Sequence, residues 1–110
     1  MNVTITARHF VIPERVRRRA LDRVQRLRRY DPRILAADVA FVRERATYIA
    51  EARLEIAGEP AAFARAKAAD PGAALDRMIE RLRRQLKRER ERARDHRAAP
   101  LYEILTPAGH

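Results

Sequence analysis

The chain of 110 residues contains no cysteine, no serine and only three glycines. The absence of cysteine excludes disulfides, cysteine-ligated zinc and thiol nucleophiles, and the absence of serine excludes serine nucleophiles. No run of apolar residues approaches the roughly 20 that a membrane-spanning helix needs. The amino terminus also lacks the basic-then-apolar pattern of a secretory signal, so we expect a cytoplasmic protein.

Charge of one sign dominates the composition. The sequence has 25 basic and 15 acidic residues, a net charge of +10, and 23 of the basic residues are arginine. A GC-rich genome would explain the preference for arginine over lysine, but it would not explain the surplus. Because such a surplus disfavours a compact chain by self-repulsion, it suits a polyanionic partner. Nucleic acid is the first candidate for this partner, and an anionic membrane surface is the second.

The hydrophobic pattern switches between the periods of strands and helices. Val3, Ile5 and Ala7 alternate with polar residues, as in a half-buried strand. An aspartate cap followed by proline, Asp70-Pro71, is typical of a helix start. The predicted elements are a strand at 2–8, a helix at 13–29, strands at 34–43, 49–56 and 60–68, and a helix from 71 to about 97.

These elements predict one small domain, because 21 of the apolar residues are alanines and the remainder fill a single two-layer core. The first helix should connect two parallel strands, and the next two connections should be hairpins. Arg45-Ala46-Thr47 lacks an Asn-Gly turn, so the first hairpin should be loose. Each helix has one apolar stripe, so both should lie on one face of a four-stranded sheet. The predicted fold class is α+β, a β-α-β-β-β-α two-layer sandwich.

Little in the sequence could catalyse a reaction. The three histidines are scattered, and no His-Glu-x-x-His motif or glycine-rich nucleotide motif occurs. Asp76 and Glu80 share a helix face, but the arginines around them indicate a salt-bridged surface rather than a metal site. We therefore expect no enzyme activity, no cofactor, no metal ion and no small-molecule substrate.

The second helix carries two stripes of basic residues three or four positions apart. The first stripe is Arg77, Arg81, Arg84 and Arg88, and the second is Arg83, Lys87, Arg90, Arg94 and Arg97. Together with eight arginines at 15–29, they predict a broad positive ridge, because the guanidinium fork binds phosphate oxygens in pairs. The alternative is an ordinary solvated, charge-rich helix surface. An aromatic content of only 5% favours recognition of structured RNA by shape and backbone over stacking of single-stranded bases.

Three segments resemble the short hibernation-promoting factor and ribosome-associated inhibitor family, the ribosomal subunit interface proteins. They are N-V-T-I-T-A-R-H, I-P-E-R-V-R-R-R-A-L-D-R-V-Q-R-L-R-R-Y and A-A-L-D-R-M-I-E-R-L-R-R-Q-L-K-R-E-R-E-R. The resemblance covers about residues 1–97 and implies a fold similar to double-stranded-RNA-binding domains. We expect a ribosome-binding domain at 1–97 and a short flexible tail at 98–110.

The resemblance implies a ribosome hibernation factor. Such a protein would bind the 16S rRNA of the small ribosomal subunit in the channel for messenger and transfer RNA, and it would inhibit translation in stationary phase or stress. Only 13 residues follow Arg97, so the dimerising domain of long members is not expected, and the protein should be monomeric off the ribosome. The rRNA contacts carried over by position are Arg17, Arg23, Arg26, Arg81, Arg88, Arg90 and Arg92, and the stripes add Arg84 and Lys87.

Two positions depart from the family pattern. Pro13 replaces the usual hydroxyl cap of the first helix, and Gly72 stands where a tyrosine is common. A generic double-stranded-RNA-binding or RNA-chaperone module is the alternative function. A helix pair that binds a membrane surface or a protein is a third reading, disfavoured because the helices lack an apolar face rich in Trp and Phe.

Overall fold

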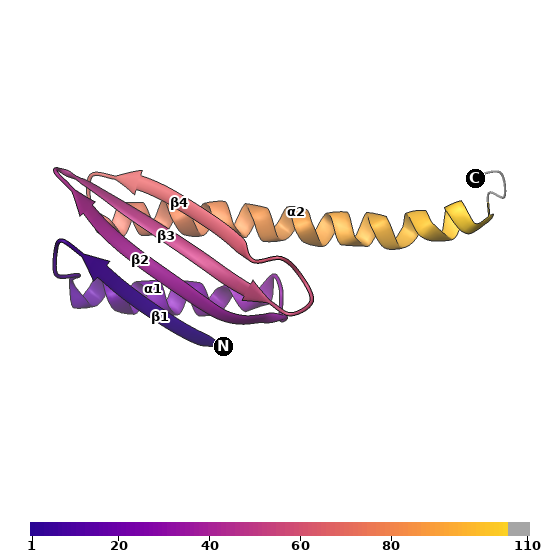
Figure 1. Ribbon diagram of the computed structural model, residues 1–110, viewed down its shortest axis with the longest axis horizontal. Helices are drawn as coiled ribbons and strands as arrows, with labels where there is room; N and C mark the ends of the chain where they lie inside the picture. The colour runs from indigo at the N-terminus through magenta and orange to yellow at the C-terminus, as the bar shows by residue number, and fades with distance from the viewer. Residues whose placement is uncertain (106–110) are drawn as a thin grey trace.

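The computed structural model describes the backbone of residues 1–105 and the side chains of residues 1–92. The elements are β1 (Asn2–Arg8), α1 (Glu14–Arg26), the 3-10 turn η1 (Leu27–Arg29), β2 (Ile34–Glu44), β3 (Thr47–Ile56), β4 (Ala62–Ala68) and α2 (Pro71–Leu105). The predicted α+β class and the β-α-β-β-β-α order are confirmed (Figure 1).

The four strands form one mixed sheet in the order β1-β2-β3-β4. β1 and β2 are parallel, and α1 makes the crossover between them, as predicted. The β2–β3 and β3–β4 pairs are antiparallel, with Phe41 opposite Ala50 and Ala52 opposite Ala64. β1 and β4 are therefore the two edges of the sheet.

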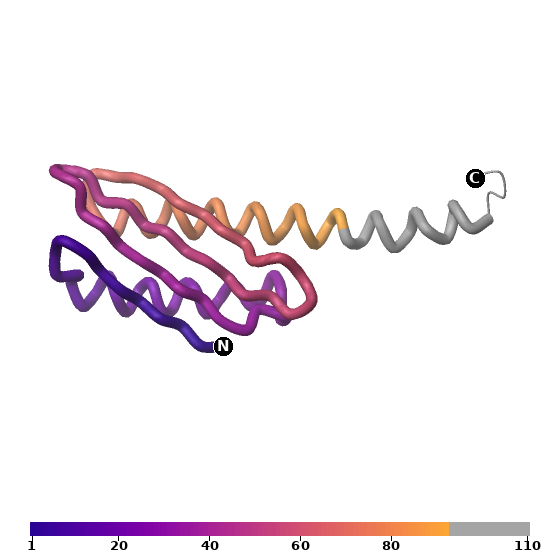
Figure 2. The backbone as a smooth tube through the Cα atoms, viewed as in Figure 1, coloured from indigo at the N-terminus to yellow at the C-terminus, as the bar shows by residue number. Residues whose placement is uncertain are grey.

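Both helices lie on one face of the sheet and run in the same direction (Figures 1 and 2). α1 packs against β1, and α2 packs against β3 and β4. α1 begins after Pro13, whose carbonyl oxygen accepts the Val16 and Arg17 amides at 2.9 and 3.0 Å. The side chain of Asp70 caps α2 by accepting the Ala73 amide at 2.8 Å, as the sequence predicted.

The core lies between the sheet and the two helices. Its largest fully buried side chains are Phe41, Leu27, Ile34, Ile49, Leu54, Leu75, Met78, Leu82, Leu86, Val24 and Val39. Each contributes roughly 1.5–3 kcal/mol when it leaves water. Small alanines on β3 and β4, Ala50 and Ala66 among them, are buried where α2 crosses these strands. Among the described residues no polar or charged residue is buried, so the charges of this part of the chain lie on its surface.

The β2–β3 hairpin is tighter than the sequence predicted. Its strands are joined by only Arg45 and Ala46, between the paired residues Glu44 and Thr47. Arg45 takes a left-handed φ of 59°, and its carbonyl oxygen accepts a hydrogen bond from Nε of Arg43 at 3.1 Å. The prediction was wrong because this side-chain contact supports a tight turn without the usual Asn-Gly pair.

α2 is longer at its carboxyl end than the predicted helix. Its bounds are Pro71–Leu105, beyond the predicted end at about Arg97, because most residues of the segment 98–105 are alanine, leucine or glutamate, which favour a helix. Leu86 is the last buried residue of α2 among those whose side chains are described, and residues 87–92 are all exposed, so the helix leaves the core after Leu86. The division into a domain at 1–97 and a tail at 98–110 stays a prediction, because the side chains of 93–110 lie outside the described residues.

Candidate nucleic-acid interface

The net charge of the molecule lies on the two helices. Residues 14–29 and 71–92 contain sixteen basic and six acidic residues, a net charge of +10. The whole chain also has a net charge of +10, so all its other residues together are neutral. Because α1 and α2 cover the same face of the sheet, this face is strongly cationic (Figure 1).

A groove with a volume of about 300 Å³ separates the second half of α1 from α2. The residues that line it are Arg23, Arg26, Leu27, Arg29, Tyr30, Asp76, Ile79, Glu80 and Arg83. Four guanidinium groups therefore share the groove with two carboxylates. This excess of positive charge favours an anionic ligand in the groove.

Asp76 connects the two helices across this groove. Its Oδ2 accepts a hydrogen bond from Nη2 of Arg19 at 2.7 Å, and its Oδ1 accepts one from Nη1 of Arg23 at 3.4 Å. All three side chains are partly exposed to water, so these pairs stabilise the fold by only about 0–1 kcal/mol. The contact with Arg23 lies in the groove, because Arg23 and Asp76 both line it.

The three predicted contacts in α1 do not lie on one surface. Arg23 and Arg26 line the groove, and Arg26 also pairs with an aspartate one turn earlier at 3.2 Å. Arg17 lies about 160° around the helix from Arg19, on the flank away from α2. There its Nη2 and Nε donate to the carboxylate of Glu14 at 2.6 and 3.0 Å.

The six predicted contacts in α2 fall into two groups. Four have a partner within the protein. Arg81 donates to the backbone carbonyl of Arg65, and Arg90 donates to that of Tyr30 at 3.3 Å. Nε of Arg84 lies 3.5 Å from Oε1 of Glu80, and Arg92 donates to the carboxylate of Glu89 at 3.2 Å. Lys87 and Arg88 are exposed and have no hydrogen bond or ion pair with any described residue. They are therefore the members of the predicted set most available to an external phosphate.

Acidic neighbours hold several of the exposed arginines. Hydrogen bonds from Arg83 keep the pKa of Glu80 below its usual value, and the same contacts raise the pKa of Arg83. Hydrogen bonds from Arg17 likewise lower the pKa of Glu14. Both carboxylates are ionised at neutral pH, so these pairs are present there. Because they are open to solvent, a phosphate can compete with either carboxylate for its arginine.

Arg29, Tyr30 and Arg83 line the groove but were not among the predicted contacts. Arg29 and Tyr30 follow α1 at the end of η1, where the helical spacing used to define stripes no longer applies. Nη1 of Arg83 lies 3.5 Å from the hydroxyl of Tyr30, so this pair joins the two walls of the groove. Arg29 and Arg83 already belonged to the predicted positive ridge, whereas nothing in the pattern of basic residues indicates Tyr30.

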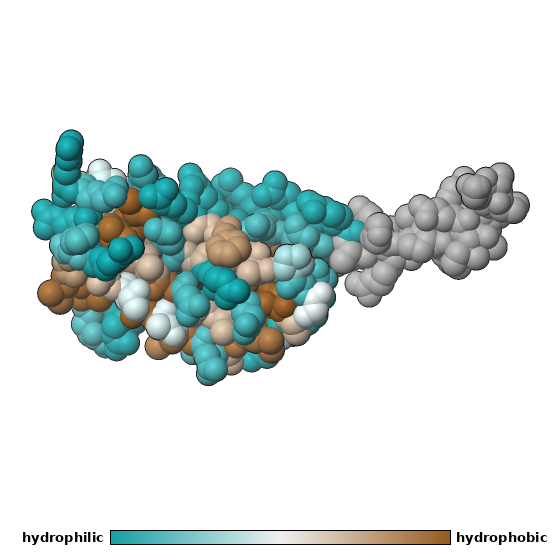
Figure 3. Space-filling model, in the orientation of Figure 1, coloured by the Kyte–Doolittle hydropathy of each residue, from teal (hydrophilic) through white to brown (hydrophobic). Residues whose placement is uncertain are grey.

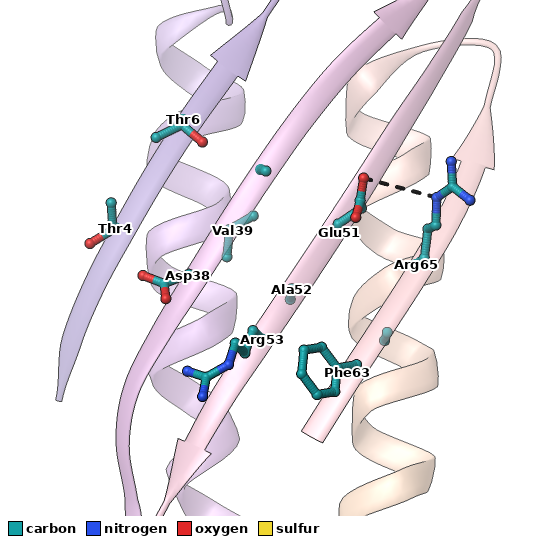
Figure 4. Close-up of a pocket in the computed structure, with 11 residues that line it drawn as sticks. Thr4, Thr6, Asp38, Val39, Glu51, Ala52, Arg53, Phe63 and Arg65 are labelled. Atoms are coloured by element: carbon teal, nitrogen blue, oxygen red, sulfur yellow. Dashed lines mark ion pairs between the residues drawn. The ribbon is translucent and has the colours of Figure 1, made fainter. Parts of the chain in front are cut away.

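The uncovered face of the sheet carries a mixture of hydrophilic and hydrophobic residues (Figure 3). It contains a broad, shallow hollow lined by Thr4, Thr6, Asp38, Val39, Ala40, Glu51, Ala52, Arg53, Phe63, Ala64 and Arg65 (Figure 4). Nε of Arg65 lies 3.9 Å from Oε1 of Glu51, and the guanidinium of Arg53 lies 5.9 Å from the ring centroid of the exposed Phe63. Acidic and basic groups are balanced here, so this face has no surplus charge to attract a polyanion.

The part of the chain that the structure describes holds no group of three or more His, Cys, Asp or Glu side chains suited to a metal ion. No helix among the described residues is both long enough and apolar enough to cross a membrane. The expectations of no enzyme activity and no cofactor stay predictions.

The fold and its charges define a class of protein, a small α+β domain with a cationic helix layer on one face of a four-stranded sheet. The family model described as "Sigma 54 modulation protein / S30EA ribosomal protein" matches residues 3–94. The chain therefore belongs to this family, and the resemblance seen in the sequence is confirmed.

Two solved structures share the fold. The N-terminal domain of Protein Y from Thermus thermophilus is 29% identical in sequence, with a TM-score of 0.72, and the match covers 80% of this chain and 98% of that one. A ribosomal subunit interface protein from Coxiella burnetii is 19% identical, with a TM-score of 0.76, and the match covers 83% of this chain and 99% of that one. The second likeness is one of fold alone. No curated protein matches the chain.

Proposed function

We propose that this protein is a ribosome hibernation factor. It binds the 16S rRNA of the small ribosomal subunit, in the channel for messenger and transfer RNA, and it inhibits translation in stationary phase or stress. It acts in the cytoplasm and is a monomer off the ribosome. Residues 1–97 form the binding domain and 98–110 a short tail. Membership of the S30EA ribosomal protein family supports the ribosome as the partner.

The observation that carries this proposal is the placement of the whole net charge on two parallel helices of one face. A polyanion is attracted to this face and not to the balanced sheet face, so the field orients the protein before contact. Structured RNA suits such a surface because its backbone presents closely spaced phosphates, each of which a guanidinium fork can bind.

Inhibition follows from occupancy of the channel. Lys87 and Arg88 of α2, which are exposed and have no hydrogen bond or ion pair with a described residue, bind phosphates directly. Arg23 and Arg26 line the groove between the helices, where a phosphate can replace their carboxylate partners. The packed core holds these groups in a fixed arrangement, so the bound domain excludes messenger and transfer RNA without any catalytic step.

The test combines binding and translation assays on charge-reversed variants. In R88E/R90E/R92E three cations of α2 become acidic, and in the matched control R53E/R65E/K67E the same change is made on the sheet. We expect the first variant to lose co-sedimentation with purified 30S subunits and inhibition of a reporter message, while the control keeps both. Circular dichroism checks that each variant is folded. Undiminished co-sedimentation of the first variant would contradict the site.

A generic double-stranded-RNA-binding or RNA-chaperone module is the competing outcome of the same assays. Equal affinity of the unsubstituted chain for an arbitrary RNA duplex and for the small subunit would favour that module. If an excess of the protein over ribosomes left translation of the reporter unchanged, the hibernation function itself would be wrong.

A further inference from the structure

β4 is an edge strand, so one row of its backbone groups has no partner strand. The carbonyl groups of Arg65 and Lys67 point to this outer side, because each accepts a hydrogen bond from outside the sheet. In an antiparallel ladder the N–H and C=O of one residue point the same way. The amides of Arg65 and Lys67 therefore also face outward.

Two arginines of α2 bind these outward carbonyls. Nη1 of Arg77 donates to the carbonyl of Lys67 at 2.7 Å, and Nη1 of Arg81 donates to the carbonyl of Arg65. Residues four apart on a helix are separated by about 6 Å along its axis, and residues two apart on a strand by about 6.8 Å. The two guanidinium groups thus match successive outward carbonyls of β4.

We propose that Arg77 and Arg81 keep the β4 edge closed and so prevent it from pairing with β4 of a second copy of this chain. An unprotected edge strand pairs readily with another strand, and covering the edge is one way in which proteins prevent this. β4 offers seven residues without proline, Ala-Phe-Ala-Arg-Ala-Lys-Ala, so no other feature of its backbone blocks the ladder.

Antiparallel self-pairing centred on Arg65 would place Phe63 opposite Lys67 of the second copy. It would also place the two copies of Arg65 opposite each other, and like charges in that position are destabilising. The arginine pair of α2 and the central Arg65 therefore both oppose self-pairing. Figure 4 shows the Arg65 side chain on the uncovered face, with α2 behind β4.

The arginines of the first stripe differ in role. Arg77 and Arg81 act at the sheet edge, whereas Arg84 and Arg88 have no hydrogen bond or ion pair with β4 among the described residues. Arg81 was predicted to bind rRNA, and its hydrogen bond to β4 gives it a different role in the free protein. This proposal does not depend on the proposed function, because it concerns the protein in the absence of RNA.

The experiment compares two double variants of the complete chain. R77A/R81A removes the edge contacts, and R84A/R88A removes two arginines from the same stripe, so the net charge falls from +10 to +8 in both. Molar mass is measured by sedimentation equilibrium over a wide concentration range. We expect the mass of R77A/R81A to rise with concentration from 12.8 kDa toward twice that value, while R84A/R88A follows the unsubstituted chain. The amides of Arg65 and Lys67 should become protected from hydrogen exchange only in R77A/R81A.

Equal masses and exchange rates for the two double variants, with both folded by circular dichroism, would overturn the proposal. An equal rise in both would assign the effect to reduced charge repulsion and would also overturn it. The single variants R77A and R81A each keep one carbonyl bound and are measured alongside. If the double variant does not fold, single variants that associate no more than the R84A/R88A control would count against the proposal.

Discussion

Removal of two exposed cations of α2 gives a quantitative test of the interface. The substitutions in K87A/R88A lie just beyond Leu86, the last buried residue in the described part of α2, and both side chains are exposed. Neither side chain has a partner among the described residues, so the change in folding free energy should stay within about 0.5 kcal/mol. Any larger loss of binding then reflects the interface rather than the fold.

The magnitude follows from counterion release. Each phosphate contact contributes roughly 0.7–0.9 to the slope of log affinity against log salt concentration, so loss of two contacts lowers the slope by about 1.4–1.8. Between about 50 and about 200 mM salt, the unsubstituted chain should lose about tenfold more affinity for the small subunit than K87A/R88A does. The assay is binding to purified 30S subunits across a salt titration.

The matched control R53A/R65A removes the same charge from the uncovered face of the sheet. If the helix layer makes the contacts, the slope of this control should stay close to that of the unsubstituted chain, because these positions face away from the RNA. Equal reductions of slope in K87A/R88A and the control would mean that total charge, rather than the position of the charge, determines binding. An unchanged slope in K87A/R88A would exclude these two residues from the interface.

Two further substitutions test the ion pairs around the interface. D76N weakens the contacts of residue 76 with its two arginine partners in α1, so it should lower the free energy of unfolding by at most about 1 kcal/mol. It should also steepen the salt dependence of 30S binding. Weaker binding would instead show that Asp76 positions those arginines. D31N tests the pH dependence of stability. The hydrogen bond from Arg33 lowers the pKa of Asp31 in the folded protein below 3.8. The stability that this carboxylate contributes is therefore present above pH 3.8, and it is lost as the pH falls through the lower pKa of the folded state. D31N should therefore be less stable than the unsubstituted chain at neutral pH in denaturant titrations, with a difference that disappears in strong acid, and a difference that persists there would contradict the assignment.

The fold could be predicted because its elements keep simple periods. β1 alternates apolar and polar residues without interruption, and the buried residues Leu75, Met78, Leu82 and Leu86 of α2 repeat at three and four. Two one-striped helices and four strands leave few ways to bury every stripe, and a single helix layer on one sheet is the simplest of them. The details that failed, a tight β2–β3 turn and the length of α2, are set by single contacts or by local propensity.

The interface could be predicted only in part. Spacing placed the arginines on their helices, because side chains three or four apart share a face. It did not reveal that Arg81 turns to the edge of β4. That outcome depends on a contact between residues far apart in the sequence, Arg81 and the carbonyl of Arg65. Helical periodicity contains no information about such contacts.

The paired and unpaired arginines make different contributions to binding. Seven of the nine predicted contacts have an internal carboxylate or carbonyl partner, and two have none among the described residues. A paired arginine must exchange one oxygen partner for another, so it gains little net free energy from a phosphate. Its side chain is already ordered, however, and it avoids part of the roughly 0.5–1.5 kcal/mol that immobilising a mobile side chain costs. The affinity for RNA should therefore depend mainly on Lys87 and Arg88. The orientation of the bound protein should depend on the paired arginines of the groove. For this reason substitutions in these two groups should affect the salt dependence of binding differently.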